Sequence, residues 1–266
     1  MGLITRENTK VARVLLVELM GTYFLVLTIA LSVGTFLGDV NTAGSLAPLS
    51  IGAILSVMIF AGGHISGAHF NPAVTMAIFL AGRKKIDLNT SIMYVIMQLI
   101  GGVMGGLGAY AMTYSKGVAP NPNPKYLWSV FFAEYFYTFA LVWVVLNTAT
   151  TKSQKGNSFF GLAIGLTVIA GAVAVGDISG GVFNPAVATG LLLSSQLHGG
   201  TYVSAWWVYF VAELLASGTA AGIFYVCNYA EEYENDGGGS RVDSEGGMAG
   251  QGPDSDAPRK NPMNIE

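Results

Sequence analysis

The chain has 266 residues, of which 52% are apolar and 11% are charged, and its net charge is −3. A soluble domain usually carries roughly 25% charged residues, so this composition excludes an ordinary soluble protein. The single cysteine, Cys227, excludes an internal disulfide and offers no metal-ligand spacing. We therefore expect no metal and no other cofactor, and no nucleic-acid partner.

Six apolar runs follow one another along the chain, and each is close to the roughly 20 residues that a membrane helix needs. They cover about 14–38, 46–63, 90–114, 127–149, 157–176 and 202–228. The sequence therefore predicts an all-α integral membrane protein with six transmembrane helices surrounded by lipid.

The basic residues predict the orientation of these helices. Six spans would place Lys116 and Lys125 on one side of the membrane and the other eleven Lys and Arg residues on the opposite side. Cytoplasmic segments carry the excess of positive charge, so we expect both termini in the cytoplasm. The sequence leaves open which membrane is involved. The eleven residues are Arg6, Lys10, Arg13, Arg83, Lys84, Lys85, Lys152, Lys155, Arg241, Arg259 and Lys260.

The tripeptide Asn-Pro-Ala occurs twice, in nearly the same frame and each time before a short apolar stretch. Proline is tolerated in the first turn of a helix, where its missing N–H has no partner to lose. A helix over 72–82 would be about 16 Å long, which is about half of a hydrocarbon core. We therefore predict two re-entrant half-helices, 72–82 and 185–193. The motif residues are Asn71, Pro72 and Ala73, and Asn184, Pro185 and Ala186.

The two motifs belong to an internal repeat. They lie 113 residues apart, and Glu18 and Glu134, each inside a predicted span, lie 116 residues apart. Each half contains three spans, so the second half is inverted in the membrane, as in proteins whose broken helices surround a solute path. The predicted segments are a cytoplasmic N-terminus at 1–11, the first repeat at 12–114, an extracellular connection at 115–126, the second repeat at 127–228 and a disordered, acidic cytoplasmic tail at 229–266.

The chemistry of the motifs indicates selection rather than catalysis. Each Asn can cap its half-helix and still donate an amide N–H into a lumen. Each helix amino end adds roughly half a positive charge, which repels cations and interrupts a proton-conducting chain of water. One isolated Asn-Pro-Ala would be an ordinary helix start, but two copies in corresponding places of an inverted repeat favour a pore.

The stretch 63–75, GHISGAHFNPAVT, resembles the major intrinsic protein family of aquaporins and aquaglyceroporins, and the likeness covers about residues 12–228. The resemblance implies a homotetramer with one pore per protomer, which passes water and in some members small neutral solutes. It also implies that Glu18 and Glu134 accept N–H bonds from the motif loops. His69 would support the first loop, and His64 could line the cytoplasmic vestibule.

The family's usual filter Arg, directly after the second motif, is Val187 in this chain. The other three filter positions correspond to Ile51, Ala172 and Gly181. This set has no charge, no side-chain donor and no aromatic ring, so we expect a wide pore in which backbone carbonyls near Gly180 guide the solute. We expect water to pass, with glycerol, urea or ammonia. By contrast, Ala188 and the pair Tyr209-Phe210 resemble the water-specific subgroup.

Three alternatives remain at this point. A secondary transporter would need more ionisable groups within its spans than Glu18, Glu134 and Glu213. A non-conducting junctional protein on the same fold would assemble without flux. An intramembrane enzyme is disfavoured because no catalytic pair or metal cluster has helical spacing, so we expect no enzymatic activity. The sequence gives no role for Glu213.

Overall fold

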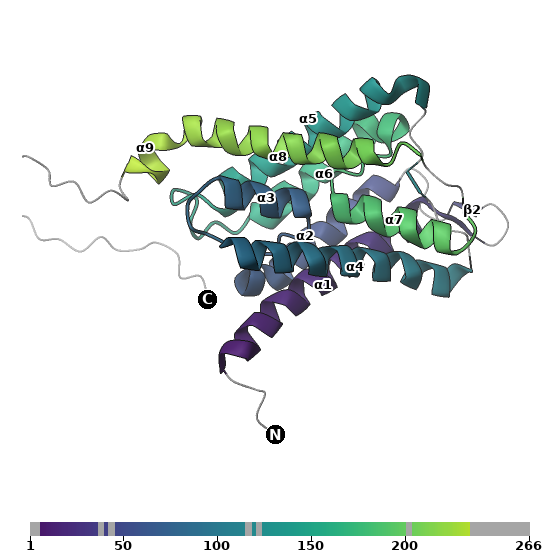
Figure 1. Cartoon of the computed structure of the whole chain (residues 1–266), viewed down its shortest axis with the longest axis horizontal. Coiled ribbons are helices and arrows are strands. Elements are labelled where there is room, and N and C mark those ends of the chain that lie inside the picture. Colours follow the sequence, from purple (N-terminus) through teal and green to yellow (C-terminus); the bar gives the residue numbers. More distant parts are fainter. Residues whose placement is uncertain are drawn as a thin grey trace, which may run out of the picture. The chain divides into compact units, whose positions relative to one another are not determined.

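The computed structural model describes residues 6–36, 40–41, 46–114, 119–120, 124–200 and 204–234, all within one compact unit that spans 1–236. Six helices in it are long and apolar enough to cross a membrane (Figure 1). These are α1 (Arg6–Val33), α2 (Ala47–Ser66), α4 (Leu88–Thr113), α5 (Leu127–Ala149), α6 (Phe160–Ser179) and α8 (Trp207–Cys227). The predicted all-helical membrane fold is therefore confirmed.

Two short helices complete the predicted architecture. They are α3 (Pro72–Leu80) and α7 (Pro185–Leu197), and both begin at the proline of an Asn-Pro-Ala motif. A further turn of helix, α9 (Tyr229–Glu232), follows α8. Among the described residues the β structure is one antiparallel pairing of β1 (Thr35–Phe36) with β2 (Val40–Asn41).

Each half-helix packs across the boundary between the repeats. Within a repeat α1 packs on α4 and α5 on α8, whereas α3 contacts α8 of the second repeat and α7 contacts α4 of the first. In Figure 1 the two short helices lie between α8 and α4, with α3 toward the left and α7 toward the right. The elements that carry the motifs thus help to join the repeats, together with the packing of α2 on α6.

Glycines allow α4 and α7 to approach each other at backbone distance. A Cβ on Gly102 would lie 2.4 Å from the carbonyl oxygen of Ala186, and one on Gly190 would lie 2.4 Å from that of Gly102. Such distances exclude any larger residue without a shift of the helices. Small residues at membrane helix interfaces permit this close packing.

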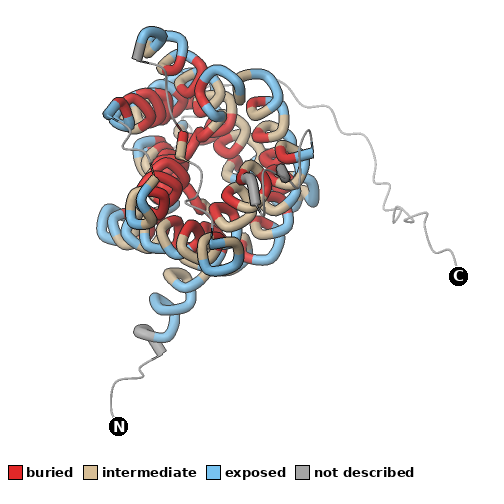
Figure 2. Tube along the Cα trace, turned by 90° about the vertical axis from the view of Figure 1, so that its right-hand side faces the viewer, coloured by how far each residue is buried: buried red, intermediate tan, exposed pale blue. Residues whose placement is uncertain are grey.

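The exposed surface of the helices is strongly apolar, and their buried faces point inward around the unit (Figure 2). Leu16, Val57 and Trp128 are 54%, 55% and 74% exposed, although apolar side chains of this size are normally buried in a soluble protein. Lipid is the environment in which such a surface is stable.

The ends of three elements differ from the sequence-based expectation. Helix α3 ends at Leu80 rather than 82, and α7 continues to Leu197, four residues beyond 193, before the turn at Gly199. The expected tail does not start at 229, because α9 occupies Tyr229–Glu232. Residues 235–266 of that tail lie outside the described residues.

Candidate functional site

Each half-helix begins with an asparagine that caps it. Asn71 and Asn184 have extended backbones, with φ of −154° and −161°. The side-chain Oδ1 of Asn71 accepts the N–H of Ala73 at 2.8 Å, and that of Asn184 accepts the N–H of Ala186 at 2.9 Å. Each cap satisfies one N–H that a helix start leaves open. Pro72, Ala73, Pro185 and Ala186 form the buried first turns behind the two asparagines.

The same asparagines join the two half-helices tip to tip. Asn71 Nδ2 donates to the carbonyl oxygen of Phe183 at 2.8 Å, and Asn184 Nδ2 donates to that of Phe70 at 2.9 Å. Each amide therefore uses its oxygen on its own helix and one hydrogen on the opposite loop, and a second hydrogen remains for another acceptor.

The loops that lead into the asparagines follow the same unusual path in both repeats. Ala68 and Phe70 have φ of 52° and 51°, and the corresponding Gly181 and Phe183 have φ of 63° and 50°. A non-glycine residue in this left-handed region is strained by roughly 1–3 kcal/mol. The surrounding contacts must therefore hold each loop in place.

A buried carboxylate supplies these contacts in the first repeat. The Oε1 of Glu18 accepts the hydroxyl of Ser66 at 2.7 Å and the N–H of His69 at 3.0 Å. Its Oε2 accepts the N–H of Phe70 and the Nε2 of Gln98, both at 2.8 Å. Glu18 is fully buried, and a charge in that position is stable only with such partners.

Glu134 occupies the corresponding place in the second repeat. Its two oxygens accept the N–H groups of Val182 at 3.0 Å and Phe183 at 2.7 Å. The Tyr209 hydroxyl also donates to the carbonyl oxygen of Ser179 at 2.6 Å, where that loop begins. The resemblance implied backbone N–H bonds from the motif loops to Glu18 and Glu134, and His69, Phe70, Val182 and Phe183 make such bonds.

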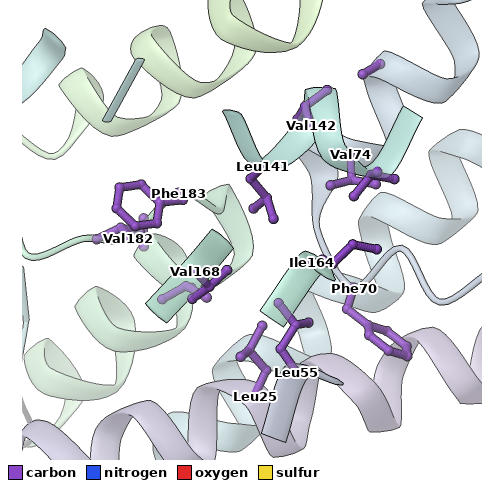
Figure 3. Packing of buried hydrophobic residues seen from close by; sticks show 14 of the residues in the cluster. Leu25, Leu55, Phe70, Val74, Leu141, Val142, Ile164, Val168, Val182 and Phe183 are labelled. Atoms are coloured by element: carbon purple, nitrogen blue, oxygen red, sulfur yellow. The ribbon is translucent and has the colours of Figure 1, made fainter. Parts of the chain in front are cut away.

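A cavity of about 700 Å³ lies along the two loops and is lined by both repeats. In Figure 3, Leu25, Leu55, Leu141 and Val168 point into a common space, and all four are cavity-lining residues. Asp177 and His69 are the ionisable side chains among the described residues of the lining. The lining includes these residues expected from the sequence: Ile51, Asn71, Ala172, Gly180, Gly181, Asn184 and Val187.

The two predicted loop histidines have different positions. His69 lines the cavity, and its Nδ1 lies 3.1 Å from the hydroxyl of Thr75 while its ring packs edge-on against Tyr94. His64 is exposed in the last turn of α2 and is not among the described residues that line the cavity.

Several participants were not found from the sequence. Gln98 bridges Glu18 and Thr75, the latter at 2.9 Å, and the carbonyls of Phe70 and Phe183 accept the crossed amide bonds. The repeat offset could have identified Gln98, because it lies 115 residues before Glu213. The two backbone acceptors could not have been identified from the sequence, because every residue has a carbonyl oxygen.

Comparisons with known proteins agree with this architecture. The family model described as "Major intrinsic protein" matches residues 5–225 and, in an overlapping second match, 161–250. The chain therefore belongs to the major intrinsic protein family, whose members are passive channels and not enzymes.

Among its relatives is "Glycerol uptake facilitator protein-like 6" of Lactiplantibacillus plantarum, which is 33% identical over 74% of this chain and 89% of that protein. "Nodulin-26" of Glycine max is 29% identical over 82% of this chain and 79% of that protein. The solved aquaglyceroporin of Plasmodium falciparum has a TM-score of 0.71 at 22% identity, over 82% of this chain and 98% of that one, which shows a shared fold.

Proposed function

We propose that this protein is a passive transmembrane channel for water and small neutral solutes, with its pore along the lined cavity. The observation that carries the proposal is the joined pair of half-helix tips, whose two asparagines line that cavity. Relatives named as a glycerol facilitator and an aquaporin, the latter from Methanothermobacter marburgensis, support the same class of solute.

The centre of the pore would select for neutral molecules. Each asparagine has one amide hydrogen left to donate to a passing oxygen, and the amino ends of α3 and α7 add roughly half a positive charge each. A cation would lose hydration against apolar walls and meet this positive potential. A water molecule can accept from the amides and move on.

The outer constriction would admit solutes larger than water. Ile51, Ala172, Gly181 and Val187 all line the cavity, and none of them carries a charge or a side-chain hydrogen-bond donor. Backbone groups near Gly180 are then the polar partners of a solute at this level. We propose that glycerol, urea and ammonia cross together with water.

We also propose a homotetrameric assembly with both termini in the cytoplasm. The even number of candidate spans supports termini on one side, and the basic residues in the predicted cytoplasmic segments support that side. The apolar outer surface supplies area for lipid and for neighbouring protomers.

Purified protein in liposomes tests the proposal by light scattering after an osmotic jump. Vesicles with the protein should shrink faster than protein-free vesicles, and inward gradients of urea and glycerol should then re-swell them. Equal shrinkage rates would refute the channel. Water flux without solute flux would refute the wide filter while leaving the water channel intact.

A further inference from the structure

We infer that Glu213 is a positioning residue for Asn184, and that it acts through the backbone of that asparagine to aim one of the two amide donors of the pore. The inference rests on the proposed channel function and gives a role to a buried carboxyl group that the motif and the filter leave unexplained.

The contact is direct and fully buried. Glu213 lies in α8 with no exposed surface, and its Oε1 accepts the N–H of Asn184 at 2.9 Å. A hydrogen bond from a backbone N–H to a carboxylate is among the stronger ones in proteins. The Oε2 atom has no hydrogen-bond partner among the described residues, and Oε1 makes this side chain an acceptor for the loop.

Glu213 extends a row of acceptors that begins with Glu134. Three successive N–H groups, those of Val182, Phe183 and Asn184, are accepted by the two carboxyl groups. Phe183 has the strained φ of 50°, and Asn184 returns to an extended φ of −161°. The chain thus changes direction between Phe183, whose N–H is accepted by Glu134, and Asn184, whose N–H is accepted by Glu213.

The first repeat uses the corresponding position differently. Tyr94 and Tyr209 lie 115 residues apart and make the same bond, each to the carbonyl of the serine that ends the helix before the loop. Gln98 and Glu213 also lie 115 residues apart, but Gln98 acts as a donor, through Nε2 to Glu18 and Thr75. The loops of the two repeats therefore follow the same backbone path, while this side chain is a donor in the first repeat and an acceptor in the second.

The bond from Glu213 helps to fix the orientation of the Asn184 side-chain amide. Its backbone N is held by Glu213, its Oδ1 by Ala186 and its Nδ2 by Phe70. With these three atoms fixed, the remaining amide hydrogen has one direction. Since the filter beside Val187 supplies no side-chain donor, discrimination between solutes depends on the asparagine pair, and the hold on Asn184 becomes a determinant of selectivity.

Two substitutions separate an acceptor from an apolar side chain of similar size. Glu213→Gln keeps an oxygen that accepts from Asn184, and Glu213→Met removes it. Leu215→Met, at a 54% exposed position on the same helix, is the matched control for methionine in α8. Water and urea permeabilities are measured on the same liposome preparation, because their ratio does not depend on how many channels are incorporated.

We expect Glu213→Met to lower water permeability per channel about tenfold. Leaving the buried N–H of Asn184 without a partner costs enough free energy to reduce the population of the correctly positioned loop by about that factor. The urea-to-water ratio should rise, because a loosened donor discriminates less. Glu213→Gln should stay within about twofold of the wild type, since a neutral acceptor is weaker but present. Leu215→Met should match the wild type.

Several outcomes would overturn the inference. It is wrong if Glu213→Met retains the wild-type ratio, or if Glu213→Gln is as impaired as Glu213→Met. If Glu213→Met does not assemble, Glu213→Ala replaces it. If neither assembles while Glu213→Gln does, the acceptor serves folding and the inference also falls. Lack of flux in the wild type would instead refute the channel itself, so the two failures are distinguishable.

Discussion

A buried ion pair helps to hold the segment after α8 against the rest of the protein, and its loss should be measurable. Arg83 Nη1 lies 3.0 Å from Glu232 Oε2, and the two side chains are 2% and 0% exposed. Glu232 Oε1 also accepts the N–H of Lys152 at 2.6 Å. Arg83 follows α3 closely in the chain, so this contact secures the base of the first half-helix. We predict that Glu232→Ala strongly destabilises the protein.

The magnitude follows from what the substitution leaves behind. Removing one partner of a buried ion pair leaves an uncompensated charge, here that of Arg83, at a cost of about 3–5 kcal/mol. For a protein of this size 1 kcal/mol corresponds to about 2–4 °C, so the melting temperature should fall by about 10 °C. The substitution leaves a second contact of this segment in place, the hydrogen bond from the Tyr233 hydroxyl to Ala81 O at 2.5 Å. Burial raises the pKa of Tyr233, so it stays a donor at neutral pH.

Thermal unfolding of detergent-solubilised protein, followed by size-exclusion chromatography after heating, measures this shift. Glu231→Ala is the control, because Glu231 is the exposed neighbour with the same chemistry. A chain that ends at Glu234 should melt like the full chain, since it keeps the ion pair. Arg83→Met added to Glu232→Ala should recover part of the loss, because no unpaired charge remains. Equal melting temperatures for Glu232→Ala and Glu231→Ala would refute the reasoning.

Three further substitutions test the filter, a helix cap and a close packing contact. Val187→Arg should reduce urea and glycerol flux more than water flux in the liposome assay, because a long charged side chain enters an apolar constriction; increased solute flux would contradict the wide-filter argument. Asp87 caps α4 and accepts hydrogen bonds from the hydroxyl and the N–H of Thr90, which lower the pKa of Asp87, the hydroxyl having the larger effect. The cap therefore stabilises α4 fully above pH 3.8, the ordinary pKa of this carboxyl group. Its contribution is lost as the pH falls through the lowered pKa. Asp87→Asn should therefore flatten the acid dependence of the melting temperature, and an unchanged profile would count against the cap. Gly102→Ala should lower both flux and melting temperature, because the added Cβ would lie 2.4 Å from Ala186 O; wild-type values for both would exclude this contact as a constraint.

The starts of the half-helices could be predicted from the sequence, and their ends less well. An asparagine cap followed by proline is a local signal, and both α3 and α7 begin where it indicates. The expected end at 193 falls short, because the chain has no proline between Pro185 and the turn at Gly199. Helix α7 therefore continues to Leu197.

The long-range contacts of the site could not be predicted from the sequence. The crossed bonds from Asn71 to Phe183 and from Asn184 to Phe70 join residues 112 and 114 positions apart through backbone oxygens, which have no sequence signature. The partner of Arg83 lies 149 residues away, in a segment whose composition is typical of a disordered tail. Composition averages over a window and cannot identify Glu232 as an acidic residue that becomes buried.

The strained loops explain why so much of the buried polar chemistry lies behind the pore rather than in it. Phe70 and Phe183 have left-handed backbones, each strained by roughly 1–3 kcal/mol relative to a relaxed loop. Relaxation of either loop would turn its carbonyl away from the opposite asparagine. Glu18 and Glu134 offset this tendency because each accepts the N–H of the strained residue itself, at 2.8 and 2.7 Å. Each carboxylate thereby fixes a carbonyl of its own loop, and that carbonyl orients the amide of the other loop. The aim of either asparagine thus depends on the buried acid of the opposite repeat, so damage to one loop should impair both halves of the pore centre together.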